Sequence, residues 1–174
     1  MKGDPNQLGF STRAVHSGQP PDERTGAVTV PIYATSTYVQ EALGRHKGYE
    51  YARVQNPTRS ALEENVAALE GGRSGHAFAS GMAAISALFT IAGSGDRIVV
   101  SRNVYGGVYR LATRVLDRTG VEFVWVDTWN LDALERAMGP NTRLVYVETP
   151  TNPMMEVTDL RRAAEIARRH GAFL

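Results

Sequence analysis

The sequence contains no cysteine, and this absence removes several kinds of chemistry at once. Disulfide bonds, thiolate nucleophiles and cysteine-ligated metal sites all require that side chain. Lysine is scarce as well, because Lys2 and Lys47 are the only two in the chain and arginine carries almost all of the positive charge. Any reaction that needs a lysine amine therefore has very few candidates within these 174 residues.

An excess of charge of one sign is also missing. The 19 Lys and Arg residues against 18 Asp and Glu give a formal net charge of +1, so we expect no nucleic-acid partner. No apolar run reaches the roughly 20 residues of a membrane-spanning helix, so we expect no membrane partner. The polar start, residues 1–7, is not a signal peptide, and together with the lack of cysteine it predicts a cytoplasmic location.

Apolar segments of two kinds alternate through most of the chain. Short runs, mostly β-branched, predict strands at residues 77–79, 98–100, 121–126 and 144–147, with a further strand beginning at 172–174. Longer amphipathic or Ala-rich segments predict helices at residues 57–70, 82–92, 108–118, 131–138 and 160–170. This alternation predicts an α/β fold with a mostly parallel sheet and helices on both faces.

Residues 1–50 differ from the rest, because they are rich in Gly, Pro, Ser and Thr and have little periodicity. We interpret them as an extended N-terminal arm with one short helix near residues 12–17. The arm cannot bury apolar residues such as Val28 and Ile32 by itself, so we expect it to lie on another subunit. Residues 51–174 then form the N-terminal part of a larger, incomplete domain.

The segment Ser80-Gly81-Met82 follows a short apolar run and opens an Ala-rich helix. A helix start directs unpaired N–H groups and the positive end of the helix dipole at one point, which suits a phosphate. Gly81 has no Cβ to block the approach, and Ser80 adds a hydroxyl donor. The alternative interpretation is a tight turn in which the glycine serves geometry alone.

Three further groups of polar or aromatic residues stand near predicted loops. Tyr51 and Arg53 pair a phenol with a guanidinium, which suits a phosphate, although a surface arginine and a packing tyrosine are the alternative. Tyr105 precedes two glycines and has room to stack on a planar cofactor, the alternative being a core tyrosine. Asn152 lies on a turn between Thr151 and Pro153, where asparagine is also a common turn former.

Six collinear motifs, together with the arm segment, resemble the transsulfuration (Cys/Met metabolism) family of pyridoxal-phosphate (PLP) enzymes, most closely its cystathionine γ-synthase and γ-lyase members. The motifs are His16-Ser17-Gly18-Gln19 with the arm segment 12–38, Tyr49-Glu50-Tyr51-Ala52-Arg53, Asn56-Pro57-Thr58-Arg59, Ser80-Gly81-Met82-Ala83-Ala84, Tyr105-Gly106-Gly107 and Glu148-Thr149-Pro150-Thr151-Asn152-Pro153. The resemblance implies a type I aminotransferase-like PLP-binding domain, usually assembled as a homotetramer, a dimer of dimers. It also implies pyridoxal 5'-phosphate as the cofactor and a small sulfur amino acid as the substrate.

The resemblance assigns roles residue by residue. Ser80 and the backbone of Gly81 and Met82 would hold the cofactor phosphate. Tyr105 would stack on the pyridine ring and assist proton transfer, which makes it the candidate catalytic residue.

Other roles complete the implied site. Asn152 would lie by the phenolic oxygen of the cofactor or by the substrate. Tyr51 and Arg53 would reach the phosphate bound by the neighbouring subunit, so that the active site is shared between subunits. Glu148 receives no role.

The family also needs a Schiff-base lysine, and neither Lys2 nor Lys47 has suitable surroundings for it. We therefore expect the chain to be an N-terminal fragment of a PLP-dependent lyase or transferase. The parent would carry out γ-elimination or γ-replacement on sulfur amino acids. Cystathionine β-lyase and homoserine-ester sulfhydrylase share the same motifs and remain alternatives.

Two other classes of protein also remain open. One is a truncated, non-catalytic chain that acts only through subunit association. The other is a dinucleotide-binding α/β protein, which the lack of a Gly-x-Gly-x-x-Gly turn disfavours. The four histidines, His16, His46, His76 and His170, show no metal-ligand spacing, so no metal is expected.

Overall fold

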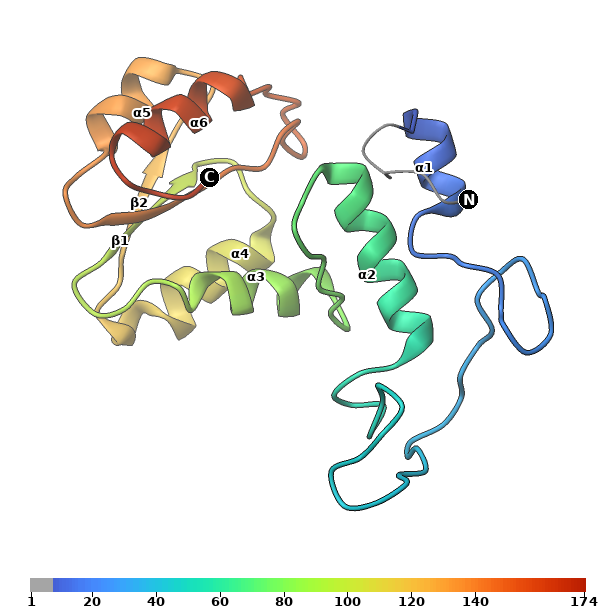
Figure 1. Ribbon diagram of the computed structural model, residues 1–174. Coiled ribbons are helices and arrows are strands. Elements are labelled where there is room, and N and C mark those ends of the chain that lie inside the picture. Colours follow the sequence, from blue (N-terminus) through green and yellow to red (C-terminus); the bar gives the residue numbers. More distant parts are fainter. Residues whose placement is uncertain (1–7) are drawn as a thin grey trace. The chain divides into compact units, whose positions relative to one another are not determined.

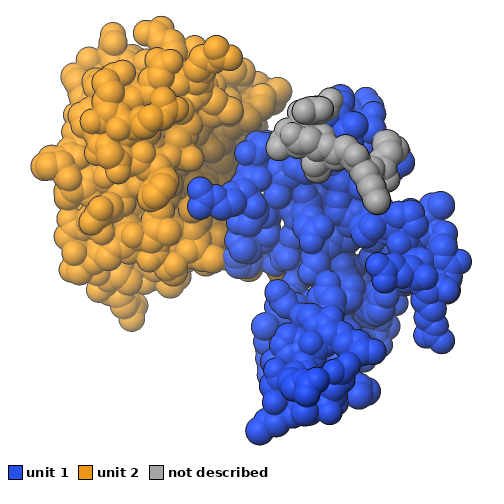
Figure 2. Space-filling model, in the orientation of Figure 1, with its two compact units in different colours: residues 1–78 blue, residues 79–174 orange. Residues whose placement is uncertain are grey.

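The computed structural model describes residues 8–174, which divide by their contacts into two units, here called unit 1 (up to Phe78) and unit 2 (Ala79–Leu174) (Figure 2). Lys2 and the polar start of the chain lie outside the described residues. Within the described part, no helix has both the length and the apolar character that crossing a membrane requires. The predicted division into an arm (1–50) and a domain (51–174) stays a prediction.

Unit 2 is built on a three-stranded sheet. Its strands are β1 (Arg97–Ser101), β2 (Glu122–Val126) and β3 (Thr142–Tyr146), in the order β2-β1-β3, and both pairings are parallel. The chain returns to the free edge of β3 at its end, where Phe173 forms an isolated parallel bridge with Leu144. The predicted parallel sheet is confirmed, and the last predicted strand is represented by this bridge.

Helices cover both faces of the sheet (Figure 1). On one face, α3 (Gly81–Phe89) and α4 (Gly106–Arg110) pack against Ile98 and Val100. On the other, α5 (Leu131–Ala137) and α6 (Leu160–Arg169) pack against Val99. Successive residues of β1 point to opposite faces, and since both faces are covered, Ile98, Val99 and Val100 are all fully buried. The predicted two-sided α/β arrangement is confirmed.

Two of the predicted helices are shorter or less regular than expected. The helix predicted to reach residue 92 ends at Phe89. The one predicted to reach residue 118 is α4 followed by a π-helix, η2 (Leu111–Val115), and a 3-10 turn, η3 (Asp117–Thr119). In the π-helical segment the hydroxyl of Thr113 donates to the carbonyl of Tyr109, 2.8 Å away, and so competes with the helical N–H for that acceptor.

The strand predicted at residues 77–79 is wrong. The structure assigns no strand there, and the side chain of Phe78 is 49% exposed. The N–H of Ala77 donates to the carboxylate of Glu63 at 2.9 Å rather than to a neighbouring strand. The run Ala77-Phe78-Ala79 has the composition of a short buried strand. A strand also needs a neighbouring strand to pair with, however, and the sequence of these residues does not show whether one is present.

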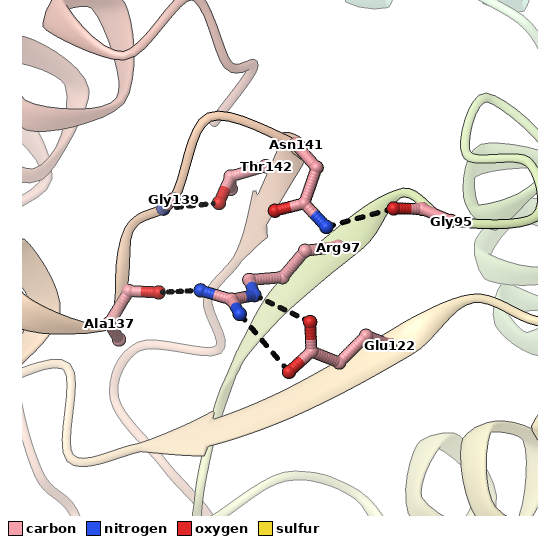
Figure 3. A network of polar contacts seen from close by, with 7 residues as sticks. All are labelled: Gly95, Arg97, Glu122, Ala137, Gly139, Asn141 and Thr142. Carbon is pink, nitrogen blue, oxygen red and sulfur yellow. Dashed lines mark hydrogen bonds and ion pairs between the residues drawn. The ribbon is translucent and has the colours of Figure 1, made fainter.

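A polar network fixes the amino ends of the strands (Figure 3). The guanidinium of Arg97 donates to both carboxylate oxygens of Glu122, at 2.9 and 3.1 Å, and to the carbonyl of Ala137 at 3.1 Å. Nearby, the side-chain amide of Asn141 donates to the carbonyl of Gly95 at 2.8 Å. These contacts tie β1, β2 and the loop before β3 together at the edge of the sheet opposite the carboxyl ends, where ligands of α/β sheets bind.

The described part of unit 1, residues 8–78, contains two helices, α1 (Phe10–His16) and α2 (Pro57–Glu70). The amide of Asn65 on α2 donates to the carbonyls of Ala14 and Ser17 at 3.1 and 2.9 Å, which holds the end of α1 against α2. The short helix predicted near residues 12–17 is confirmed as α1. Val28 and Ile32 are 80% and 86% exposed, so this chain does not bury them, and their contact with another subunit stays a prediction.

Replacing Asn56 by alanine is expected to lower the free energy of unfolding by about 1 kcal/mol, the usual cost of losing a helix N-cap. Asn56 Oδ1 accepts from the N–H of Thr58 at 2.9 Å at the start of α2, and Nδ2 donates to the carbonyl of Tyr33 at 2.9 Å. Urea unfolding of the full-length protein measures the loss. Asn56→Asp keeps the capping oxygen and is expected to lose less; equal losses in both variants would contradict the capping role.

Candidate functional site

The amino end of α3 is an open hydrogen-bond donor site. Ser80 caps the helix, its Oγ accepting from the N–H of Ala83 at 3.1 Å, which leaves its own hydroxyl hydrogen for another acceptor. Among residues 8–174 the backbone N–H groups of Gly81 and Met82 have no acceptor. A Cβ built on Gly81 meets no atom within 4 Å. Two free donors at a helix start with open space in front of them form a cradle for an anion.

Tyr105 lies beside this helix start. It follows β1, precedes α4 and is 57% exposed, which excludes the interpretation as a core tyrosine. A Cβ added at the buried Gly107 would lie 2.4 Å from Tyr105 Cε1 and 2.8 Å from Met82 Sδ, so the ring and the start of α3 meet at this glycine. The structure therefore brings Tyr105 together with the Ser80–Met82 segment, as the sequence predicts.

Glu148 connects two loops at the carboxyl ends of β1 and β3. Its Oε2 accepts from the backbone N–H of Tyr105 at 2.9 Å, and its Oε1 accepts from the hydroxyl of Tyr146 at 3.1 Å. Burial raises the pKa of the Tyr146 phenol well above its usual value, and the charge and hydrogen bond of Glu148 raise it further. The phenol therefore stays protonated and donates to the carboxylate.

Asn152 lies exposed on the loop that follows β3. The buried side chain of its neighbour Thr151 anchors this loop: Thr151 Oγ1 accepts from the amide of Asn103 at 3.3 Å and from the N–H of Glu156 at 3.0 Å. The structure thus places Asn152 at the same end of the sheet, the carboxyl ends of the strands, as the loop that carries Asn103 and Tyr105.

A chain of buried hydroxyl groups also supports these loops, and the sequence analysis missed it. Ser101 at the end of β1 is 2.8 Å from Thr128, and Thr128 is 2.8 Å from Thr158. The N–H of Thr158 donates to Thr149 Oγ1 at 3.0 Å. The sequence did hold a signal for these hydroxyl groups: a serine or threonine stands at or shortly after the end of each β-branched run. Buried polar groups at strand ends need hydrogen-bond partners, and a hydroxyl can supply them.

Tyr51 and Arg53 belong to unit 1 and lie together. The guanidinium carbon of Arg53 is 4.8 Å from the centre of the Tyr51 ring, a cation–π contact. Arg59 on α2 donates to the carbonyls of Ala52 and Val54, at 3.2 and 2.5 Å, and so fixes the backbone on both sides of Arg53. Within the described residues Arg53 forms no ion pair, so its charge is left for an outside anion.

The family is decided by comparison with known proteins. A family model described as "Cys/Met metabolism PLP-dependent enzyme" matches residues 11–174. The chain belongs to this family. Its members depend on pyridoxal 5'-phosphate, and the residues of unit 2 fit that group, since the cradle at Gly81 suits its phosphate and the exposed Tyr105 ring suits its planar ring.

Individual relatives agree with this assignment. Cystathionine gamma-lyase of Bacillus subtilis (strain 168) is 52% identical over 163 residues, which cover 94% of this chain and 43% of the relative. A probable cystathionine gamma-synthase of Herpetosiphon aurantiacus is 47% identical, covering 95% of this chain and 52% of the relative. The crystal structure of metB from Corynebacterium glutamicum matches with a TM-score of 0.93 and 47% identity, covering 98% of this chain and 45% of that one.

Two consequences follow from these comparisons. The likeness to the solved structure confirms the predicted type I PLP-binding fold. The chain spans about half the length of the relatives, or less.

Proposed function

We propose that the protein to which this chain belongs catalyses PLP-dependent γ-elimination or γ-replacement on a small sulfur amino acid of the cystathionine type. Family membership supports a PLP-dependent reaction. The observation that carries the proposal is the pairing of free amides at Gly81 and Met82 with the exposed ring of Tyr105. A phosphate cradle beside an aromatic platform suits a phosphorylated planar cofactor better than a bare metabolite.

The residues of unit 2 would divide the work between binding and proton transfer. PLP, when bound, supplies an electron sink for the carbanion left when the α-proton of an amino acid is removed. The Gly81 and Met82 amides and the Ser80 hydroxyl bind its phosphate. Tyr105 would stack on its ring, and its phenol hydroxyl would donate a proton or, once deprotonated, take one back. Asn152 contacts the phenolic oxygen of the cofactor or the substrate.

The quaternary part of the proposal rests on unit 1. Tyr51 and Arg53 reach the phosphate held by the neighbouring subunit, so that the active site is a property of a dimer within a homotetramer. Two observations support this arrangement: Arg53 forms no ion pair with any residue in the range 8–174, and Val28 and Ile32 are exposed. We expect the protein to act in the cytoplasm.

Two measurements on the full-length protein test the function. An absorption band at about 420 nm that disappears on reduction with borohydride is expected for PLP joined to a lysine. If the reaction is γ-elimination, incubation with cystathionine is expected to release cysteine, the product of cleavage on the γ side; if it is γ-replacement, a homoserine ester and cysteine are expected to give cystathionine and the free acid. Release of homocysteine would instead assign a β-lyase, and turnover of a homoserine ester with sulfide would assign a sulfhydrylase. A protein with no band and no product would contradict the proposal.

Replacing Gly107 by alanine is expected to weaken PLP binding about tenfold with little change in stability. The added Cβ would overlap the Tyr105 ring and lie 2.8 Å from Met82 Sδ. Both are side-chain atoms that can move at small cost, but the displaced ring no longer offers its stacking face. Gly106→Ala is the matched control, because its Cβ would meet only Arg110 Nη1 at 3.3 Å. Titration of the apoprotein with PLP measures both; equal affinities would refute the steric argument.

A further inference from the structure

We propose that Glu148 is a positioning residue for Tyr105: its carboxylate fixes the backbone from which the stacking ring projects. This inference rests on the proposed function, because the role of the Tyr105 ring comes from it. Neither family membership nor the position of Glu148 in its motif assigns it a role. Its hydrogen bonds to Tyr105 and Tyr146 do assign one.

The carboxylate of Glu148 bridges Tyr105, which lies 43 positions before it in sequence, and Tyr146, which lies 2 positions before it. Oε2 accepts from the N–H of Tyr105 at 2.9 Å and Oε1 accepts from the hydroxyl of Tyr146 at 3.1 Å. Tyr105 lies in the loop after β1, and Tyr146 ends the neighbouring strand β3, where it pairs in register with Val100 of β1. Glu148 therefore ties the loop after β1 to the end of β3 with one side chain.

The Tyr146 end of this bridge is rigid. Its ring meets the ring of Phe89 edge to face, with centroids 5.3 Å apart and an interplanar angle of 86°. Phe89 is 2% exposed and belongs to the core between α3 and the sheet. The carboxylate is thus anchored to the packed core through a phenol that stays protonated.

The Tyr105 end, in contrast, has little packing of its own. The ring is 57% exposed, and Gly107, which lies against it, has no side chain to pack on it. The position of the ring therefore depends on the backbone of Tyr105, whose N–H is held by Glu148. Fixing an aromatic platform in advance of binding reduces the entropy lost when a ligand stacks on it.

The bridge uses both carboxylate oxygens as acceptors. A glutamine offers the Tyr105 N–H only a neutral amide oxygen, which is a weaker acceptor than a carboxylate, and its NH₂ reaches Tyr146 only if the phenol reverses from donor to acceptor. An aspartate keeps both oxygens on a side chain one methylene shorter. Glu148→Gln therefore loosens Tyr105 while it preserves the size of the side chain.

Hydrogen exchange on the full-length apoprotein tests the contact without any activity. In Glu148→Gln the segment 103–108 is expected to exchange about tenfold faster than in the wild type, because the N–H of Tyr105 loses a charged acceptor. Tyr146→Phe, which frees the far end of the bridge, is expected to give a smaller increase. Glu165→Gln, on the exposed surface of α6, makes the same charge change and is expected to leave the segment unaffected. Unchanged exchange in Glu148→Gln would overturn the proposal.

A double-mutant cycle on PLP affinity tests whether Glu148 acts through the ring. Glu148→Gln is expected to raise the dissociation constant about tenfold in the wild type but to have no effect when Tyr105 is already alanine. Equal losses in both backgrounds would show a general structural role and would overturn the proposal. A wild-type protein that binds no PLP would instead refute the proposed function, while the exchange experiment would still report on the contact.

Discussion

Replacing Arg53 by alanine is expected to weaken PLP binding to the full-length protein about a hundredfold. Hydrogen bonds from a guanidinium to a phosphate contribute about 1.5–3 kcal/mol each, and a hundredfold change corresponds to about 2.8 kcal/mol, close to the lower end expected for a fork of two such bonds. The backbone around Arg53 is preorganised, because Arg59 donates hydrogen bonds to the carbonyls on both sides of it. No carboxylate among the described residues forms an ion pair with the Arg53 guanidinium. Titration of the apoprotein, followed at the cofactor band, measures the change.

Two controls separate a phosphate contact from a general loss of structure. Pyridoxal lacks the phosphate, so its weaker binding is expected to be the same in the wild type and in Arg53→Ala. Arg45→Ala removes an exposed arginine that already pairs with Glu41 at 3.5 Å, and PLP affinity is expected to remain unchanged. If Arg53→Ala reduced the affinity for pyridoxal and PLP equally, the phosphate role would be wrong.

Mixing variants tests whether the site is shared between subunits. Subunits carrying Arg53→Ala, combined with subunits whose Gly81 is replaced by aspartate, form mixed dimers in which one site has an intact Gly81 cradle and an intact Arg53. Recovery of PLP binding in the mixture, above that of either variant alone, is the expected result. Absence of recovery, with mixed dimers verified by mass spectrometry, would place Arg53 in the same subunit's site or outside any site.

Replacing Leu134 by alanine is expected to lower the free energy of unfolding by about 3 kcal/mol. Leu134 on α5 is fully buried and packs in the cluster that joins α5 and α6 to Val99 of β1 and Val145 of β3. Removing its methyl groups loses transfer free energy and leaves a cavity that the close-packed surroundings fill only in part. Chemical denaturation of the full-length protein checks the value.

The matched control for this prediction lies on the same helix. Arg136 is exposed and pairs with no carboxylate among the described residues, so Arg136→Ala is expected to change stability by about 0.5 kcal/mol or less. A loss in Leu134→Ala as small as that of the control would mean that the cluster does not contribute to the stability of the fold.

Local patterns were sufficient where a residue's role depends on its neighbours in sequence. Asn56 followed by Pro57 predicted the start of α2, and Ser80 followed by Gly81 predicted the start of α3, because a helix cap is made within a few residues. The same reasoning failed for residues 77–79 and for the π-helical segment Leu111–Val115. A strand depends on a distant pairing partner, and an irregular helix depends on which carbonyl competes for each donor.

The sequence by itself determined the α/β class and the family, since these follow from the order of residue types along the chain. Only the tertiary structure decided that Tyr105 is exposed over Gly107 beside Met82, and that Glu148 holds the backbone of Tyr105. The physical reason is that hydrogen bonds and van der Waals contacts act over a few ångströms in space. Parallel strands bring Tyr105 and Glu148 within that range although 43 positions separate them in the chain.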